Sequence, residues 1–414
     1  MNKNNLPCWK TFSNFLKKGK NVKDFGFLCK NGELSRINAR YKMIKNFESI
    51  LFNNYSINTI EKYNSLFKIF LAYSLFENYL KNGLGIKNDY YKMAGDIISK
   101  KYPTLSEQLL KLDKNKKFYS FLLTYLNSKH RNNIENFYNK KEHNVIYLIS
   151  AIRHVFAHGI LVANNIIAPK KLTNLIVNNL LDYIKDDFAL RICSKICVLT
   201  TIFPMDKKYL YDFFDSLSNQ TYKNFDIIVV NDGYNKFDEI KEKYKNLNII
   251  ELKYSSTPAK NREYGINYCI DKKYNFLIFG DSDDYFSENR IEKNLEKLQQ
   301  YDIVVNDLTL FNDKGIICNN YFSNRLKNNF IFDYKFIKDK NICGLSNTAL
   351  NLKILSNIEF PEDIIAVDWY LFKKILKKNK AVFTNETTTY YRQYENNTLG
   401  LKNDKKYLFW HEGE

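Results

Sequence analysis

The stretch YNFLIFGDSDD at residues 274–284 places three carboxylates directly behind a short apolar run. Such a run, ending in glycine and acids, is typical of a buried parallel strand that leaves its sheet. In open α/β sheets the ligand crevice lies at the carboxyl ends of the strands. We therefore expect Asp281, Asp283 and Asp284 to face a substrate, together with Mg²⁺ or Mn²⁺ that bridges carboxylates to phosphates. Alternatively, the acids form a turn that caps a helix beginning near Ser287.

The segments before this stretch alternate between two hydrophobic patterns. Short β-branched runs predict four strands, at residues 196–202, 225–231, 247–252 and 276–279. Amphipathic segments between them predict three helices, at residues 207–218, 237–244 and 258–270. A βαβαβαβ order predicts an α/β fold with a mostly parallel sheet and right-handed crossovers.

The first half of the chain has a different hydrophobic pattern. Apolar residues recur at helical spacing over 60–70, 118–126 and 145–156, in long runs without glycine or proline. This pattern predicts a helical bundle. The first 35 residues show no clear period, and we expect them to be loosely ordered. We predict two domains: an all-α domain at 1–190 and an α/β domain at 191–414.

Charge is distributed unevenly over the 414 residues, which carry a net charge of +18. Residues 1–190 hold 30 Lys and Arg against 14 Asp and Glu, a net charge of +16. Residues 191–414 hold 33 against 31, a net charge of +2. A genome-wide bias towards lysine would act on both halves alike. The asymmetry predicts an anionic partner for the first half, either a membrane surface or nucleic acid.

The sequence features that indicate a cellular compartment favour the cytoplasm. The opening MNKNNLPCWK has no apolar core of a signal peptide, and the most apolar helical stretch, 65–80, contains Lys68 and Glu77. Seven cysteines show no paired framework, and Cys193 and Cys197 have no partners at zinc spacing. We expect reduced thiols in a cytoplasmic protein.

Four motifs follow one another from residue 200: TTIF at 200–203, LSNQTYKNFDIIVVNDG at 217–233, TPAKNREYG at 257–265, and DSDD at 281–284. Together they resemble an inverting family-2 glycosyltransferase with the GT-A fold. The resemblance implies a nucleotide-sugar donor, with a UDP-sugar favoured, and residues 191–414 as the transferase domain. Tyr234 stands where the family's loop has Ser.

The resemblance also implies roles for five residues. Thr201 lies where the first strand ends against the nucleotide, and Asp232 binds the base. Arg262 approaches the diphosphate, Asp281 lies towards the ribose, and Asp283 holds Mn²⁺ or Mg²⁺. The residues themselves leave two alternatives open. Asp232 before a glycine is also typical of a turn, and Arg262 is also consistent with a solvated helix charge.

Later segments continue the resemblance. GLSNTA at 344–349 matches an acceptor-side loop, and VDWY at 367–370 matches an "ED-W" segment with Val replacing Glu. This match implies that Asp368 is the catalytic base, although an aspartate here also suits a helix cap. YRQYENNT at 391–398 resembles an ending in which a histidine reaches the metal or diphosphate; here that position is Tyr394.

The chemistry agrees with the resemblance. Transfer from a nucleotide sugar expels a diphosphate, whose charge a cation on Asp283 would neutralise. The acceptor hydroxyl loses its proton as it attacks, and Asp368 would accept it. We therefore expect a cytoplasmic, inverting, metal-dependent glycosyltransferase that builds bacterial surface glycan, such as capsule or lipopolysaccharide. Its acceptor would be a glycan or lipid-linked hydroxyl.

The helical half contains a second motif, SAIRHVFAHG at 150–159, which resembles the R-x4-H helix of the HEPN superfamily. That resemblance implies an alternative: an RNA-binding or ribonuclease protein, with Arg153 and His158 as its pair and a non-catalytic nucleotide-sugar-binding domain. His158 before a glycine also suits a helix C-terminus. Our main expectation for residues 1–190 is a dimerisation or docking module, with homodimers and peripheral contact with anionic membrane at the inner face. Nucleic acid is not the expected partner.

Overall fold

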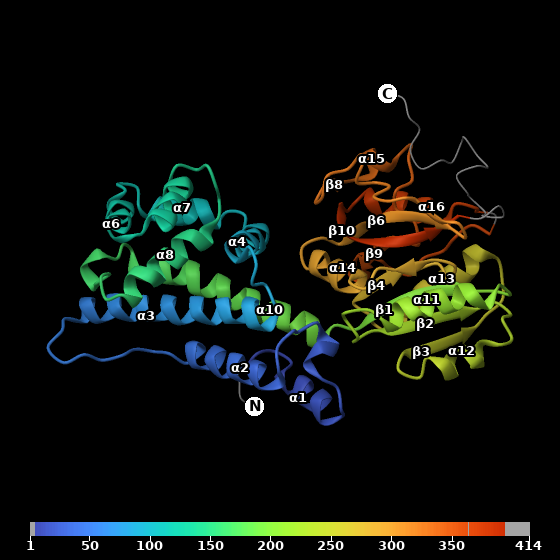
Figure 1. Ribbon diagram of the computed structural model, residues 1–414, viewed down its shortest axis with the longest axis horizontal. Coiled ribbons are helices and arrows are strands. Elements are labelled where there is room, and N and C mark those ends of the chain that lie inside the picture. The colour runs from blue at the N-terminus through green and yellow to red at the C-terminus, as the bar shows by residue number, and fades with distance from the viewer. Residues whose placement is uncertain (1–4, 363, 394–414) are drawn as a thin grey trace. The chain divides into compact units, whose positions relative to one another are not determined.

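A computed structural model describes residues 5–362 and 364–393 of the chain. The chain divides into two compact units, Met1–Cys193 and Ser194–Glu414. Unit 1 is helical and unit 2 combines a sheet with helices, as the blue-to-green and green-to-red ribbons of Figure 1 show. The predicted fold class, an all-α domain before an α/β domain, is confirmed.

Unit 2 is built on a 10-stranded sheet in the described residues, with strand order β3-β2-β1-β4-β9-β6-β10-β5; β7 pairs with β6 and β8 with β10. The strands are β1 (Ile196–Ile202), β2 (Asp226–Asn231), β3 (Asn248–Lys253), β4 (Phe276–Phe279), β5 (Tyr285–Phe286), β6 (Ile303–Asn312), β7 (Gly315–Cys318), β8 (Ile331–Phe332), β9 (Thr348–Asn351) and β10 (Ala381–Arg392). The helices are α11 (Lys207–Ser218), α12 (Phe237–Lys243), α13 (Pro258–Asp271), α14 (Arg290–Leu298), α15 (Tyr334–Ile337) and α16 (Val367–Leu376).

The first four strands form the parallel part of this sheet. β1 pairs in parallel with β2 and β4, and β2 with β3, as the sequence predicts. Beyond β4 the sheet is mixed, because β9 lies antiparallel between β4 and β6. Because β9 is antiparallel to both β4 and β6, and β10 is parallel to β6, strands β6 and β10 run in the same direction as β1–β4. The sheet is therefore mostly parallel, as predicted, and the reversal at β9 is the feature that hydrophobic periodicity does not describe.

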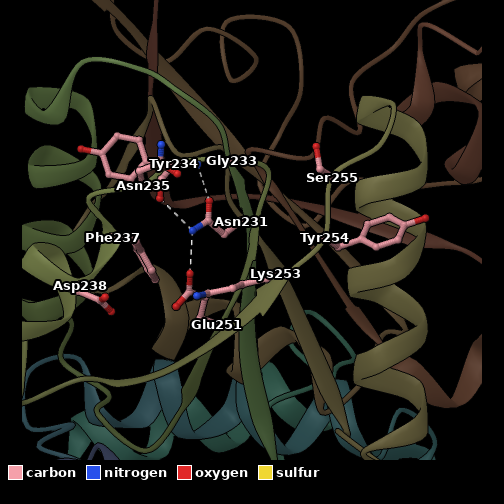
Figure 2. A pocket seen from close by; sticks show the side chains of 10 residues that line it. All are labelled: Asn231, Gly233, Tyr234, Asn235, Phe237, Asp238, Glu251, Lys253, Tyr254 and Ser255. Carbon is pink, nitrogen blue, oxygen red and sulfur yellow. Dashed lines mark hydrogen bonds between the residues drawn. The ribbon is translucent and has the colours of Figure 1, made fainter.

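Close packing of α13 on the parallel strands depends on one glycine. A Cβ atom on Gly265 would lie 2.6 Å from a methyl carbon of Leu199 and 2.9 Å from one of Val230. Only glycine lets the helix approach the sheet this closely. The carboxyl ends of β2 and β3 then meet the loop before α13, where the cavity drawn in Figure 2 lies.

Unit 1 is helical throughout its described residues, and α3 is its longest helix. The helices are α1 (Trp9–Lys17), η1 (Val22–Phe25), α2 (Asn31–Lys45), α3 (Ile57–Asn78), η2 (Tyr79–Gly83), α4 (Tyr90–Lys101), α5 (Leu105–Leu112), α6 (Lys117–Tyr125), α7 (Ser128–Tyr138), α8 (Val145–Ala157), η3 (Ala163–Asn165), α9 (Pro169–Thr173), η4 (Asn174–Asn178) and α10 (Asn179–Cys193). Nowhere in the described chain is a helix both long and apolar enough to cross a bilayer.

We expected the first 35 residues to be loosely ordered, but residues 5–35 are ordered. They pack into the core of unit 1, where Phe12, Phe25 and Phe27 are fully buried. The rings of Phe12 and Phe27 lie 5.6 and 5.9 Å from that of Phe188 on α10. Aromatic packing orders this segment, and the apolar residues Trp9, Phe12 and Leu16 of α1 do recur at helical spacing, a signal that the prediction missed.

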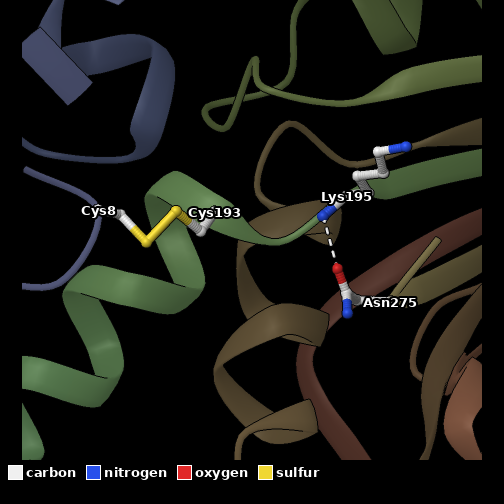
Figure 3. The surroundings of a disulfide bond; sticks show 4 residues. All are labelled: Cys8, Cys193, Lys195 and Asn275. Atoms are coloured by element: carbon white, nitrogen blue, oxygen red, sulfur yellow. Dashed lines mark hydrogen bonds between the residues drawn. A yellow bond between two sulfur atoms is a disulfide. The ribbon is translucent and has the colours of Figure 1, made fainter. Parts of the chain in front are cut away.

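The expectation that all seven cysteines are reduced is wrong for this structure. Cys8, which precedes α1, forms a disulfide with Cys193, the last residue of α10 (Figure 3). The partners are 185 residues apart, so spacing along the chain gives no sign of the pair. Packing of α1 against α10 brings them together. The described free cysteines are Cys29, Cys197, Cys269, Cys318 and Cys343.

Candidate active site

The acidic loop, residues 281–284, leaves the sheet at the end of β4. The sequence suggested that all three of its carboxylates face a substrate, but one of them does not. Asp284 is 1% exposed, and its carboxylate accepts hydrogen bonds from the backbone N–H of Arg392 (2.8 Å) and the hydroxyl of Ser346. Burial, with the charges of Asp283 and Asp281, raises the pKa of Asp284 well above its ordinary value. Asp281 and Asp283 remain half-buried at the surface of the loop.

Arg392, on the last described strand, determines the shape of this loop. It is 4% exposed, and its Nε donates to the carbonyl oxygen of Asp283 at 2.8 Å. Its Nη2 binds Asp212 of α11 at 2.5 Å. From the other side, the Ser282 hydroxyl donates to the carbonyl of Thr201 at 2.9 Å. Thr201 thus reaches the acidic loop through its backbone, at the end of β1.

The predicted base, Asp368, lies in the first turn of α16. Its Oδ1 accepts the backbone N–H of Trp369 at 2.7 Å, and its Oδ2 accepts Nδ2 of Asn341 at 2.9 Å. Burial raises the pKa of Asp368; the two hydrogen bonds and the charge of Arg262 oppose this, while Asp281 adds to it. Arg262 and Asp281 thus act electrostatically on Asp368, and Arg262 also contacts Asp281 directly at 3.2 Å.

Arg262 binds the acidic loop directly and is not merely a solvated helix charge. It lies in the first turns of α13, and its Nη2 is 3.2 Å from Oδ1 of Asp281. Both side chains are partly exposed, at 25% and 30%. A pair this accessible contributes at most about 1 kcal/mol to stability. Its guanidinium is therefore accessible to an anionic ligand at little energetic cost.

Asp232 follows β2 and is held by residues of α13 and of the loop before it. Its carboxylate accepts Nδ2 of Asn261 at 2.8 Å and the hydroxyl of Ser255. Its own N–H donates to the carbonyl of Ile202 at 2.8 Å, which ties it to the end of β1. Gly233 has φ +81°, so the turn expected here is present alongside a positioned carboxylate.

Beside Asp232, a cavity of about 380 Å³ opens between the ends of β2 and β3. Figure 2 shows Asn231 at its centre, with its Nδ2 donating to Glu251 at 2.7 Å and to the carbonyl of Tyr234 at 3.1 Å. Ser255 belongs both to its lining and to the hydrogen bonds of Asp232. The cavity is polar and within the size range of small-molecule sites.

The acidic loop fits a divalent cation only if the cation is shared between one or two carboxylates and the phosphates of the substrate. Among the described residues no group of three His, Cys, Asp or Glu side chains is placed to hold a metal. Mg²⁺ or Mn²⁺ bound through one or two carboxylates and substrate phosphates needs no such group. Burial is the main cause of the raised pKa of Asp284; repulsion from Asp283 and Asp281 adds to it, and a cation would relieve that second part. Tyr394, expected to replace a metal-reaching histidine, lies outside the described residues.

Sequence reasoning assigned no role to several residues that support this site. Asn341 binds Asp368, Ser346 binds Asp284, and Arg392 binds the acidic loop. Tyr391 lies among the acids, since burial and the charges of Asp284, Asp281, Asp283 and Asp368 raise its pKa well above its ordinary value. Tyr391 and Arg392 stood in the quoted YRQ motif, which was the only signal for them.

The Arg153 and His158 pair of unit 1 sits at the end of α8. The Arg153 guanidinium lies 6.0 Å from the ring centroid of Phe70. His158 is the residue after the helix, before Gly159 at φ +73°, as in the helix-end interpretation. The HEPN alternative gains no support from any comparison below.

The open sheet of unit 2, with parallel strands β1–β4, a mixed second half and carboxylates at its strand ends, has the GT-A type of fold. Residues 197–350 match the family model described as Glycosyl transferase family 2. These residues of unit 2 therefore carry a glycosyltransferase family 2 domain.

Curated relatives agree with this family. The chain is 27% identical over 217 residues to glycosyltransferase GlyA of Streptococcus pneumoniae, covering 48% of this chain and 30% of GlyA. It is 30% identical to O-antigen biosynthesis glycosyltransferase WbnJ of Escherichia coli, covering 31% of this chain and 51% of WbnJ. It is 29% identical to Escherichia coli WfaP, a UDP-Glc:alpha-D-GlcNAc-diphosphoundecaprenol beta-1,3-glucosyltransferase, covering 45% and 72%. The chain thus spans about a third of GlyA and half of WbnJ.

Among solved structures, S. aureus TarS (residues 1–349, with UDP-GlcNAc) matches with a TM-score of 0.40 and 21% identity. The match covers 49% of this chain and 60% of TarS.

Proposed function

We propose that the chain transfers a sugar, with inversion, from a UDP-sugar to a hydroxyl of a glycan or lipid-linked acceptor during bacterial surface glycan synthesis. The observation that carries this proposal is the contact of Arg262 with Asp281 on the acidic loop, where the charges of both residues act on Asp368. The site offers a base of raised pKa, an arginine for phosphate and a carboxylate for a cation. These are the groups that displacement of a nucleoside diphosphate requires.

In this mechanism the acceptor hydroxyl gives its proton to a carboxylate oxygen of Asp368. Each carboxylate oxygen has two lone pairs, so the bonds from Trp369 and Asn341 orient the group and leave it able to accept. Its raised pKa makes it a stronger base than an exposed aspartate. Arg262 would bind the departing diphosphate. A cation held by Asp283, when bound, would supply Lewis-acid neutralisation of that charge.

The donor's base would bind at Asp232, next to the cavity of Figure 2. The name of the relative WfaP contains UDP-Glc and a diphosphoundecaprenol-linked sugar, which supports a UDP-sugar donor and a lipid-linked acceptor here. The ribose would lie towards Asp281, and Thr201 would line the nucleotide side at the end of β1.

We also propose a cytoplasmic location with peripheral contact at the inner membrane face, and homodimers through unit 1. The disulfide between Cys8 and Cys193 bears on the location, because disulfides are uncommon in reducing compartments. Alkylation of thiols in intact cells, followed by mass spectrometry, tests it. Modified Cys8 and Cys193 would support the cytoplasm, and an intact pair would contradict it.

The decisive experiment for the activity is a thermal-shift screen of UDP-, GDP- and CMP-sugars with and without Mn²⁺, followed by a transfer assay with the best donor. We expect a UDP-sugar to raise the melting temperature more strongly with Mn²⁺ than without it. Release of UDP should then depend on Asp368. If none of the nucleotide sugars stabilises the protein, the proposal fails.

A further inference from the structure

Among the exposed apolar side chains of unit 1, three lie in one short stretch, the connection between α2 and α3 with the start of α3. In this connection and at the start of α3, Leu51 is 81% exposed, Tyr55 54% and Ile57 78%. Figure 1 shows the connection as the long blue segment leading to the start of α3. Clustered exposed side chains of this kind mark a surface that binds something apolar.

The segment is held in place by the helix that follows it. The buried Asn64 of α3 accepts the N–H of Ile50 at 2.7 Å and donates to the carbonyl of Ile50 at 3.2 Å. Ser56 caps α3 by accepting the N–H of Thr59 at 3.2 Å. Leu51, Tyr55 and Ile57 are thus presented outwards on an anchored backbone.

Half-buried aromatic rings form the base of the same surface. The ring of Phe52 lies 5.8 Å from that of Tyr63 and 6.5 Å from that of Phe67, both on α3. Tyr55 lies 6.2 Å from Tyr63. We call Leu51, Phe52, Tyr55, Ile57, Tyr63 and Phe67 the α2–α3 apolar surface.

Cations lie beside this surface. Lys45 at the end of α2 is exposed, and Lys62 on α3 adjoins Tyr63 in sequence. Lys170 of α9 reaches Glu61 on α3 at 3.1 Å, which places Lys170 and its exposed neighbour Lys171 near the same end of α3. Glu48 and Glu61 are the acidic residues of this part of unit 1. Positive charge therefore exceeds negative charge around an apolar centre.

We propose that the α2–α3 apolar surface docks unit 1 onto an anionic lipid bilayer. Leu51 and Ile57 enter the boundary of the acyl chains, the tyrosines lie at headgroup level, and the lysines contact lipid phosphates. A second copy of the chain fits this particular surface less well, because the lysines around it would meet the same lysines of the partner. The proposal rests on the peripheral membrane contact proposed above and names the surface that makes it; it does not depend on the acidic loop.

The test is sedimentation of the full chain with vesicles of phosphatidylglycerol and phosphatidylcholine, compared with phosphatidylcholine alone, across a salt series. We expect binding to the anionic vesicles that weakens with salt, as screening of lysine–phosphate attraction requires. Leu51→Glu with Ile57→Glu should lower the apparent partition coefficient by about tenfold or more, since it removes two inserted side chains and adds repulsion.

Ile316→Glu with Ile317→Glu is the matched control. It removes two exposed isoleucines (58% and 52%) of unit 2 and makes the same change in charge. We expect the control to sediment like the unmodified chain and both variants to keep UDP-sugar affinity. Equal binding to both vesicle types, or equal loss in the control, would overturn the proposal. So would a dimer in analytical ultracentrifugation that Leu51→Glu with Ile57→Glu disrupts while vesicle binding persists.

Discussion

Replacing Asp368 by Asn removes the proposed base while changing the packing very little. In the native site Oδ1 accepts the Trp369 N–H and Oδ2 accepts Nδ2 of Asn341. An asparagine retains the first bond through its oxygen, but its amide nitrogen would then face the donor of Asn341. Rotating Asn341 would cost its own acceptor role, because its Oδ1 accepts the N–H of Cys343 at 3.3 Å. Either way about one hydrogen bond is lost.

The magnitudes separate a structural role from a catalytic one. One hydrogen bond is worth about 1 kcal/mol, or roughly 2–4 °C in the melting temperature of a domain of this size. Loss of general-base catalysis lowers kcat by roughly 10²–10⁴, equivalent to about 3–5 kcal/mol. We therefore expect Asp368→Asn to keep donor affinity, lose a few degrees of stability and lose most of its turnover. The assay is kcat and KM for UDP release, with donor affinity from calorimetry.

The pH profile adds a second measurement. The base acts only when ionised, and the pKa of Asp368 is raised. In the native enzyme kcat/KM should therefore fall, as pH decreases, at a higher pH than an ordinary aspartate would give, and Asp368→Asn should lack this limb. Asp333→Asn, which alters an aspartate that caps α15 through the Lys335 N–H at 2.9 Å, is the control. Near-native turnover of Asp368→Asn would refute the role of Asp368 as the base.

Three further outcomes follow from the contacts described. Asp283→Ala should weaken UDP-sugar binding in Mn²⁺ as much as EDTA does for the native chain. EDTA should then have no further effect on the variant. If calorimetry shows that the native chain keeps its affinity under EDTA, the metal is ruled out. Arg392→Met loses charged hydrogen bonds to Asp212 and to the Asp283 carbonyl. It should destabilise unit 2 by about 2–3 kcal/mol and weaken donor binding, both measured by calorimetry. An unchanged melting temperature would contradict the role of Arg392 in the acidic loop. Cys8→Ser opens a loop of 185 residues and should cost about 2–5 kcal/mol in non-reducing denaturant titrations but nothing under reductant, where the Cys8–Cys193 bond is absent in both chains.

Much of unit 2 was predictable because its early strands are continuous apolar runs. Predicted bounds for β1 and β4 agree with the structure, those for β2 begin one residue early, and those for β3 are shifted by one residue at both ends. Strands buried on both faces read as such runs whatever their neighbours are. The acidic residues after β4 and the aspartate after β2 were visible for the same reason: they end an apolar run abruptly.

Contacts between distant segments were not predictable. Whether an acid faces solvent or the core depends on what packs behind it, and Asp284 is buried by Ser346 and Arg392, which lie 62 and 108 residues later. The disulfide and the ordered lead-in of unit 1 likewise depend on α10. Local periodicity contains no information on such pairings, because each depends on the complete set of helices and strands around it.

The bond from Arg392 to the acidic loop has a consequence for biosynthesis. A ribosome that has just completed Asp284 has made the acidic loop, yet the partner of this loop on β10 is still 108 residues from being synthesised. Until that strand has emerged and paired with β5 and β6, a nascent chain lacks the hydrogen bonds that Arg392 gives to the Asp284 carboxylate and the Asp283 carbonyl. Assembly of the candidate active site therefore awaits late translation, and a prematurely terminated chain would present a sheet whose acidic loop is not held in place.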